Sequence, residues 1–224
     1  MGEIAAVSEN KNAIKILKPK IQEDLPQFDL LKKGISDYDS ISSVLINKCL
    51  IQNFKTRRVS FNEVIFRNVK FVNILFDGAE FLDVKFENCD LSNVDLSGSS
   101  FCRVELKNCK LTGCNFAEGF FKNVTFNECS GQYTCFRFSK FKQAAFKNSE
   151  LPCVDFGGSE FSKLELKRTD ITQGQFYNVR LKGIDFTSCK IDGIAAGLED
   201  IKGAVISYDQ AISIIGLLGV VLRN

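Results

Sequence analysis

FENCDLSNVDLSGSSF, residues 86–101, carries a large apolar side chain at every fifth position: Phe86, Leu91, Leu96 and Phe101. The same step of five runs without insertion from Phe61 to Ile191, and Gly131 is its single exception. A second series, two residues before each of these positions, consists mostly of small or β-branched residues. A period of five fits neither the 3.6-residue period of a helix nor the two-residue period of a strand. It predicts a solenoid with a corner at every fifth residue and with both series directed inward.

These pentads, together with ELKNCKLTGCNF at residues 105–116, resemble the pentapeptide-repeat family over roughly residues 41–206. The resemblance implies an all-β fold, the right-handed quadrilateral β-helix, in which four pentads form one square coil of twenty residues. We therefore expect about eight coils in residues 41–206. Residues 1–40 do not follow the pentad and are expected to form an irregular N-terminal cap. Residues 207–224 are expected to form a C-terminal cap and dimerisation segment.

A coil of twenty residues places every residue above the residue twenty positions earlier. One predicted column contains aromatic residues, namely Phe61, Phe81, Phe101, Phe121, Phe141 and Phe161. We expect their rings to stack. An outward column contains Asn68, Asn88, Asn108, Glu128 and Asn148. We expect its amides to hydrogen-bond between coils, as asparagine ladders do in other stacked sheets.

The composition argues against enzymatic chemistry. The 224 residues include 29 basic and 27 acidic side chains, for a net charge of +2, and no histidine. The absence of histidine removes Ser-His and Cys-His dyads and imidazole metal sites. The sequence also lacks a phosphate-binding loop and a dinucleotide-binding fingerprint. We therefore expect no catalytic residues, no cofactor and no metal.

Six of the nine cysteines occupy the small inward position of the pentad: Cys49, Cys89, Cys109, Cys114, Cys129 and Cys189. There they are expected to act as compact hydrophobic side chains. The first residues do not resemble a secretion signal. The longest apolar stretch, residues 211–222, is interrupted by Ser213, Gly216 and Gly219 and is shorter than a membrane span. We expect reduced thiols, a cytoplasmic protein and no membrane contact.

The C-terminal end predicts a short helix and an interface. Ser207 or Asp209 can begin a helix that ends at Gly216 or Gly219. Residues 211–222 carry too many apolar side chains to pack on one coil end. In addition, residues 191–222 resemble the dimerisation end of the quinolone-resistance (Qnr-type) pentapeptide proteins. We expect a homodimer. Its predicted contact residues are Ile212, Ile215, Leu218, Val220 and Leu222.

Two groups of outward residues are candidates for binding a partner. The aromatic group, Phe120, Tyr133 and Phe138, lies near Gly131 in the sequence. Either one of these rings turns inward to fill the space left by Gly131, or the three form an exposed patch. The acidic group, Asp83, Glu87 and Asp90, belongs to a local stretch of carboxylates.

The class of function favoured by the sequence is a non-enzymatic, dimeric interaction or scaffold module with a protein partner. The Qnr-type resemblance implies an alternative, protection of DNA gyrase or topoisomerase IV from quinolones. A mimic of DNA needs phosphate-like charge along its length. Residues 61–200 contain 17 basic and 19 acidic residues, which is nearly neutral. A small basic cluster at residues 55–58 does not predict direct binding of nucleic acid.

Overall fold

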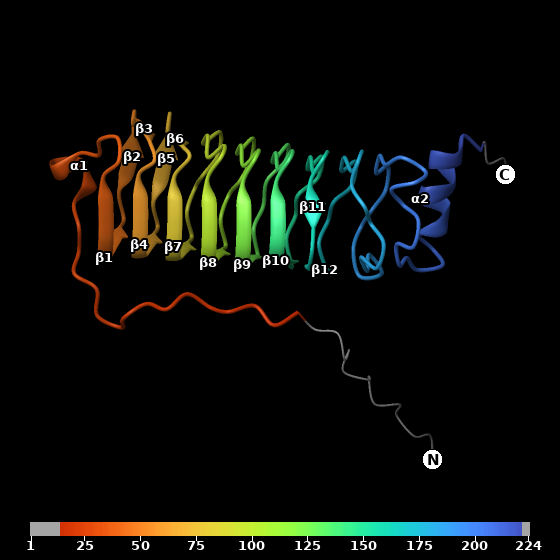
Figure 1. Ribbon diagram of the computed structural model, residues 1–224, viewed down its shortest axis with the longest axis horizontal. Coiled ribbons are helices and arrows are strands. Elements are labelled where there is room, and N and C mark those ends of the chain that lie inside the picture. The colour runs from red at the N-terminus through yellow and green to blue at the C-terminus, as the bar shows by residue number, and fades with distance from the viewer. Residues whose placement is uncertain (1–13, 221–224) are drawn as a thin grey trace, which may run out of the picture.

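The fold consists of one long strand in each of several successive coils. The computed structural model describes residues 14–220. Its long strands lie side by side in one parallel sheet (Figure 1): β1 (Ser40–Asn47), β4 (Ser60–Arg67), β7 (Glu80–Glu87), β8 (Ser100–Lys107), β9 (Phe120–Asn127), β10 (Lys140–Lys147), β11 (Glu160–Phe161) and β12 (Leu164–Lys167). Short strands pair on other sides of the coil: β2 (Leu50–Gln52) with β5 (Lys70–Val72), and β3 (Lys55–Arg57) with β6 (Leu75–Asp77). The architecture is a parallel β-solenoid, as the sequence predicted.

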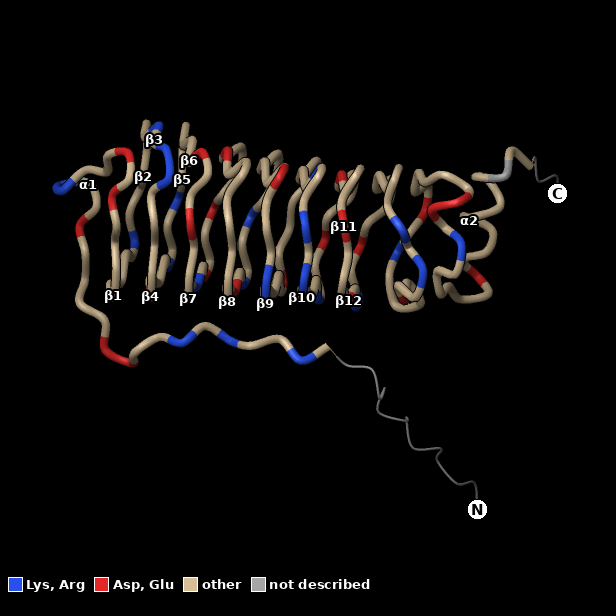
Figure 2. The backbone as a smooth tube through the Cα atoms, viewed as in Figure 1, with Lys and Arg blue, Asp and Glu red and all other residues tan. Residues whose placement is uncertain are grey.

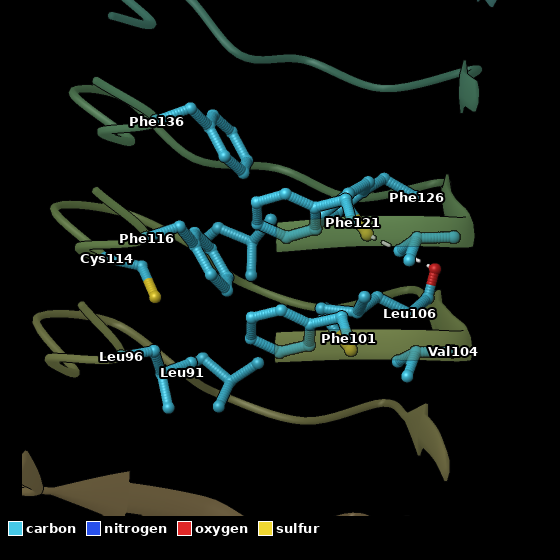
Figure 3. Packing of buried hydrophobic residues seen from close by; sticks show 14 of the residues in the cluster. Leu91, Leu96, Phe101, Val104, Leu106, Cys114, Phe116, Phe121, Phe126 and Phe136 are labelled. Carbon is cyan, nitrogen blue, oxygen red and sulfur yellow. Dashed lines mark hydrogen bonds between the residues drawn. The ribbon is translucent and has the colours of Figure 1, made fainter. Parts of the chain in front are cut away.

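The strands keep a register of twenty residues, which brings the predicted aromatic column together. Phe61 pairs with Phe81, and Phe81 pairs with Phe101. The rings of Phe101 and Phe121 are stacked, with centroids 4.9 Å apart and planes 1° from parallel (Figure 3). Phe121 and Phe141 stack at 4.6 Å. Such contacts stabilise the fold by about 0.5–1.5 kcal/mol per pair beyond the burial of the rings.

The asparagine column follows from the shape of the corners. Asn68 and Asn88 have φ of 53° and 55°, in the left-handed region that asparagine tolerates better than most residues. The Asn88 amide donates to the Asn68 oxygen at 3.3 Å, and the Asn108 amide donates to the Asn88 oxygen at 2.8 Å. The predicted ladder is therefore present in these coils. It stops at Glu128, since the Asn148 amide donates to Asn127 instead.

The small inward positions also carry hydrogen bonds between coils. The Cys89 thiol donates to the carbonyl of Phe66 at 3.3 Å, and the Ser139 hydroxyl donates to the carbonyl of Phe116 at 3.0 Å. In both cases the acceptor lies 23 residues earlier in the chain. Burial raises the pKa of the Cys114 thiol well above its usual value, as expected for a thiol that packs as an apolar group.

The strand-bearing part of the solenoid is shorter than the predicted eight coils. From β1 to β11 there are six steps of twenty residues, starting at Ser40 and ending at Glu160. After β12 the pentads continue, but single bridges join their coils, the last of them between Asp185 and Val205. Turns occupy most of each coil there. Turns extend the rod without adding strands, so a count of pentads overestimates the number of strand-bearing turns.

Each end of the solenoid carries a short helix. α1 (Leu30–Lys33) lies at the first coil, and α2 (Ala211–Ile215) followed by η1 (Gly216–Leu218) lies at the last (Figure 1). Gly219 has φ of 70° and ends the C-terminal helical segment, as the sequence predicted. Between residues 14 and 220, neither helix has the length and apolar character needed to span a bilayer.

Candidate interaction surfaces

A notch of about 190 Å³ is open on the outer surface of the solenoid. Its lining comes from three successive coils and includes Arg137, Phe138, Asp155, Gly157, Gly158 and Tyr177. The middle coil contributes Gly157 and Gly158, which have no side chains. The recess therefore lies between Phe138 of the preceding coil and Tyr177 of the following coil. A Cβ atom on Gly158 would lie 2.5 Å from Cδ1 of Phe138, which means that the Phe138 ring lies directly against this glycine.

Contacts around the notch fix the position of its ring and its charges. The Phe138 backbone has φ of 58°, which is uncommon for an aromatic residue. The Arg137 guanidinium lies 5.2 Å from the centroid of the Phe138 ring and 3.3 Å from the Asp155 carboxylate. That carboxylate also accepts the Gly157 amide at 2.8 Å. The notch thus combines exposed aromatic surface with an ion pair that is already matched, and it can accept an apolar or planar side chain.

The predicted aromatic residues do not form one patch. Phe138 lines the notch, and Phe120 is half-buried, with the Lys142 ammonium 6.0 Å from its ring centroid. Tyr133 is 62% exposed and stands at the corner before the bridge residue Cys135, whereas Phe138 stands at the corner after it. The short side of the coil between these two corners separates Tyr133 from the other two rings.

None of the three rings turns inward to replace the missing side chain of Gly131. Tyr133 and Phe138 are exposed, and Phe120 occupies an outward position paired with Ser100. A Cβ atom on Gly131 would lie 2.7 Å from the carbonyl carbon of Leu111. The interpretation that a ring fills a space at Gly131 is therefore wrong, because the backbones of the two coils already approach each other too closely there.

The three acidic candidates lie in different surroundings, and each has a basic neighbour. Asp83 is only 5% exposed and pairs with Arg103 at 2.5 Å, while Glu87 pairs with Arg67 at 2.7 Å. Burial opposes ionisation of Asp83, but hydrogen bonds from Arg103 and from a backbone amide outweigh it and lower the pKa of this carboxyl. The pKa of Asp90 is also lowered, because hydrogen bonds from Ser92 outweigh its burial.

The C-terminal end presents apolar side chains. Ile212 is 64% exposed, Val220 is exposed as well, and Ile215 is half-buried. Leu218 is the last residue of η1. Leu222 lies outside the described residues. The predicted dimer contacts therefore include at least two exposed side chains, Ile212 and Val220.

Sequence reasoning missed most of the notch. Tyr177, Asp155 and the two glycines lie far from Tyr133 and Phe138 in sequence, so the cluster of aromatic residues around Gly131 does not point to them. The available signal was spacing: the Gly157–Gly158 pair lies twenty residues after Arg137 and Phe138, and Tyr177 lies twenty residues after Gly157. In a coil of twenty residues such a pattern predicts a recess between two rings.

Comparison with known proteins agrees with this architecture. Residues 40–116, 79–156 and 99–176 match the model of the family described as "Pentapeptide repeat region". A search of curated proteins finds no match. Among solved structures, full-length QnrB1, a plasmid-mediated fluoroquinolone resistance protein, is 16% identical, with 79% of this chain and 100% of that chain covered and a TM-score of 0.44. HetL, a pentapeptide-repeat protein involved in heterocyst differentiation regulation in the cyanobacterium Nostoc, is 12% identical, with 76% and 90% covered and a TM-score of 0.37. Since the matches to the family model together cover residues 40–176, more than half of the sequence, this chain belongs to the pentapeptide-repeat family.

Proposed function

We propose that the protein is a non-enzymatic interaction module that binds a partner protein at the notch between Phe138 and Tyr177. The observation that supports this most is the exposure of these two rings, 56% and 53%, around a recess that the chain's own side chains leave open. Aromatic and arginine side chains around a preformed pocket are typical of protein-binding hot spots. The Phe138 ring lies against Gly158 and beside the Arg137 guanidinium, so binding requires little ordering of this wall of the notch.

We also propose that two copies associate through their C-terminal ends. The exposed side chains of Ile212 and Val220 support this proposal, because exposed apolar side chains at the end of a solenoid favour association. Such a dimer would place two notches on one rod-shaped assembly. A scaffold with two equivalent sites can bind a dimeric partner more tightly than either site alone.

A type II topoisomerase is the second candidate partner, and it has weaker support. A DNA-like surface needs a continuous negative strip, whereas Asp83 and Glu87 are each paired with an arginine one coil away. Basic and acidic residues are interspersed along the rod (Figure 2). A gyrase supercoiling assay with ciprofloxacin tests this candidate directly. Rescue by the protein, lost on charge reversal at Glu87 and Asp90, would favour topoisomerase protection over the general scaffold.

Site-specific photo-crosslinking tests the proposed notch. A photoreactive phenylalanine analogue at Tyr177 should give a discrete crosslinked product with a partner in cells, and Phe138→Ala should abolish that product because it removes one wall of the notch. The same analogue at Tyr133 is the matched control, since this ring has similar exposure but lies at the other corner. No product at Tyr177, or an identical product from Tyr133, would contradict the proposal.

A further inference from the structure

The N-terminal segment lies across the outside of the solenoid rather than over its end. Residues 14–25, named the strap here, run alongside the coils from β10 back towards β1 (Figures 1 and 2). Three hydrogen bonds join the strap to the coils: the Lys20 amide donates to Asp83 at 2.8 Å, the Leu17 amide donates to Asn123 at 3.2 Å, and the Gln143 side chain donates to the Lys15 carbonyl at 3.2 Å. The strap is thus held by its backbone, as a bound peptide would be.

The side chains under the strap form one outward column whose members lie twenty residues apart. Asp83 and Asn123 are 5% and 3% exposed, although they occupy an outward position. Lys163, in the same column but beyond the strap, is exposed. Arg103 lies between the two buried residues, and its guanidinium donates two hydrogen bonds to Asp83. The column therefore forms a polar binding surface with hydrogen-bond acceptors at fixed positions. Its acceptor residues are buried where the strap covers them.

The spacing of the acceptors matches an extended peptide. Asp83 and Asn123 are two coils apart, which is about 10 Å at the usual strand separation of about 4.8 Å. Leu17 and Lys20, which donate to them, are three residues apart, and three residues of extended chain also span about 10 Å. An extended segment with three residues per turn, as in polyproline II, can therefore donate every third amide to this column without stretching or bending.

The strap's side chains indicate the chemistry that the surface accepts. Five apolar residues of the strap are half-buried: Ile14, Ile16, Pro19, Ile21 and Leu25. The lysines between them, Lys15, Lys18 and Lys20, are exposed. The positive charge of Lys20 contributes to the lowered pKa of Asp83, together with the stronger effect of Arg103. The matching ligand is an extended segment with apolar residues at this spacing and a lysine placed near Asp83.

We propose that this column of the solenoid is a peptide-binding surface, that the strap occupies it in the resting protein, and that an extended lysine-containing segment of a partner protein binds there by displacing the strap. Displacement leaves the coils intact, because the chain joins the first coil after the strap, at Pro26, whose carbonyl accepts the Leu45 amide at 2.9 Å. The surface is separate from the notch. Its test does not depend on any partner that binds at the notch.

The test uses a dye-labelled synthetic peptide with the sequence of residues 14–25 and measures its fluorescence anisotropy with full-length protein. The variant Leu17→Pro/Lys20→Pro removes both donated amides and should release the strap. We expect this variant to bind the peptide at least about tenfold more tightly than the unmodified chain does. Gln22→Pro is the matched control, since it adds a proline to the strap without removing those amides, and it should bind like the unmodified chain. Asp83→Ala, added to the double variant, should weaken binding about tenfold.

A second measurement covers the case in which the double proline variant does not fold. An excess of isotopically labelled peptide should accelerate hydrogen exchange at the Leu17 and Lys20 amides of the unmodified chain, because the peptide replaces the strap. A scrambled peptide should have no effect. Unchanged exchange, or equal peptide affinity for the folded double variant and the unmodified chain, would overturn the proposal.

Discussion

Replacing Phe121 by leucine separates the energy of its contacts with other rings from the energy of burial. Phe121 is fully buried and stacks on Phe101 at 4.9 Å and on Phe141 at 4.6 Å. Leucine keeps most of the apolar volume but removes both stacked contacts, together with the edge-on or tilted contacts of Phe121 with Phe116, Phe126 and Phe136. At about 0.5–1.5 kcal/mol per pair, loss of the two stacked contacts alone should make Phe121→Leu lower the free energy of unfolding by at least about 1–3 kcal/mol. Phe121→Ala also leaves a cavity, and it should cost about 3–5 kcal/mol or more.

Phe161→Leu is a control within the same column. The Phe161 ring is half-buried and meets Phe141 edge-on, at 5.4 Å and 68°, and the next residue in the column is Leu181. It therefore has no parallel ring neighbour to lose. Guanidinium denaturation followed by far-UV circular dichroism gives the three free energies. If Phe121→Leu costs no more than Phe161→Leu, the stacked column does not contribute beyond burial and the reasoning is refuted.

Three further predictions concern the coil, its charges and its end. Ser139→Ala should cost about 1 kcal/mol in guanidinium denaturation, because it removes the hydroxyl that donates to the Phe116 carbonyl, and Ser139→Cys should cost less; equal losses would contradict this role. Folding lowers the pKa of Asp83 and of Asp170, because hydrogen bonds to each carboxylate outweigh its burial. Both carboxylates therefore stabilise the fold at a pH above their unfolded pKa of about 4. This stabilisation is lost as the pH falls through the pKa of the folded state. The melting temperature should therefore drop below about pH 4, and Asp83→Asn should reduce that drop. Ile212→Asp should convert a dimer to a monomer in sedimentation equilibrium at micromolar concentration, and an unmodified chain that is already monomeric would contradict the dimer.

The repeated part of the fold could be predicted because a coil of fixed length converts sequence spacing into contact. Once twenty residues form a coil, Phe121 must lie above Phe101, and Asn108 above Asn88. The same rule applied to the surface would have found Tyr177 beside Gly157. The recess has no signal of its own in the residue types, because it is produced by the missing side chains of Gly157 and Gly158 rather than by residues that bind.

The strap could not be predicted from the repeat, since it contains no pentads. Its contacts join residues 63 and 106 positions apart, between Lys20 and Asp83 and between Leu17 and Asn123. Neither partner signals the other in sequence, because Asp83 and Asn123 stand at ordinary outward positions. Only the three-dimensional course of residues 14–25 explains why two polar side chains on an outer surface are buried.

Wrapping the chain also changes the meaning of its acidic stretch. In sequence, Asp83, Glu87 and Asp90 are near neighbours and suggest one negative surface. In the coil they stand at different points of the perimeter, and the residues one coil away are cations: Arg103 for Asp83, Arg67 for Glu87, and both Lys70 and Lys110 for Asp90. Opposite charges in adjacent coils cancel at distances beyond a Debye length of about 8 Å. A partner that approaches the acidic stretch therefore meets little net negative field there, and recognition at that part of the rod has to rely on shape and on hydrogen bonding rather than on charge.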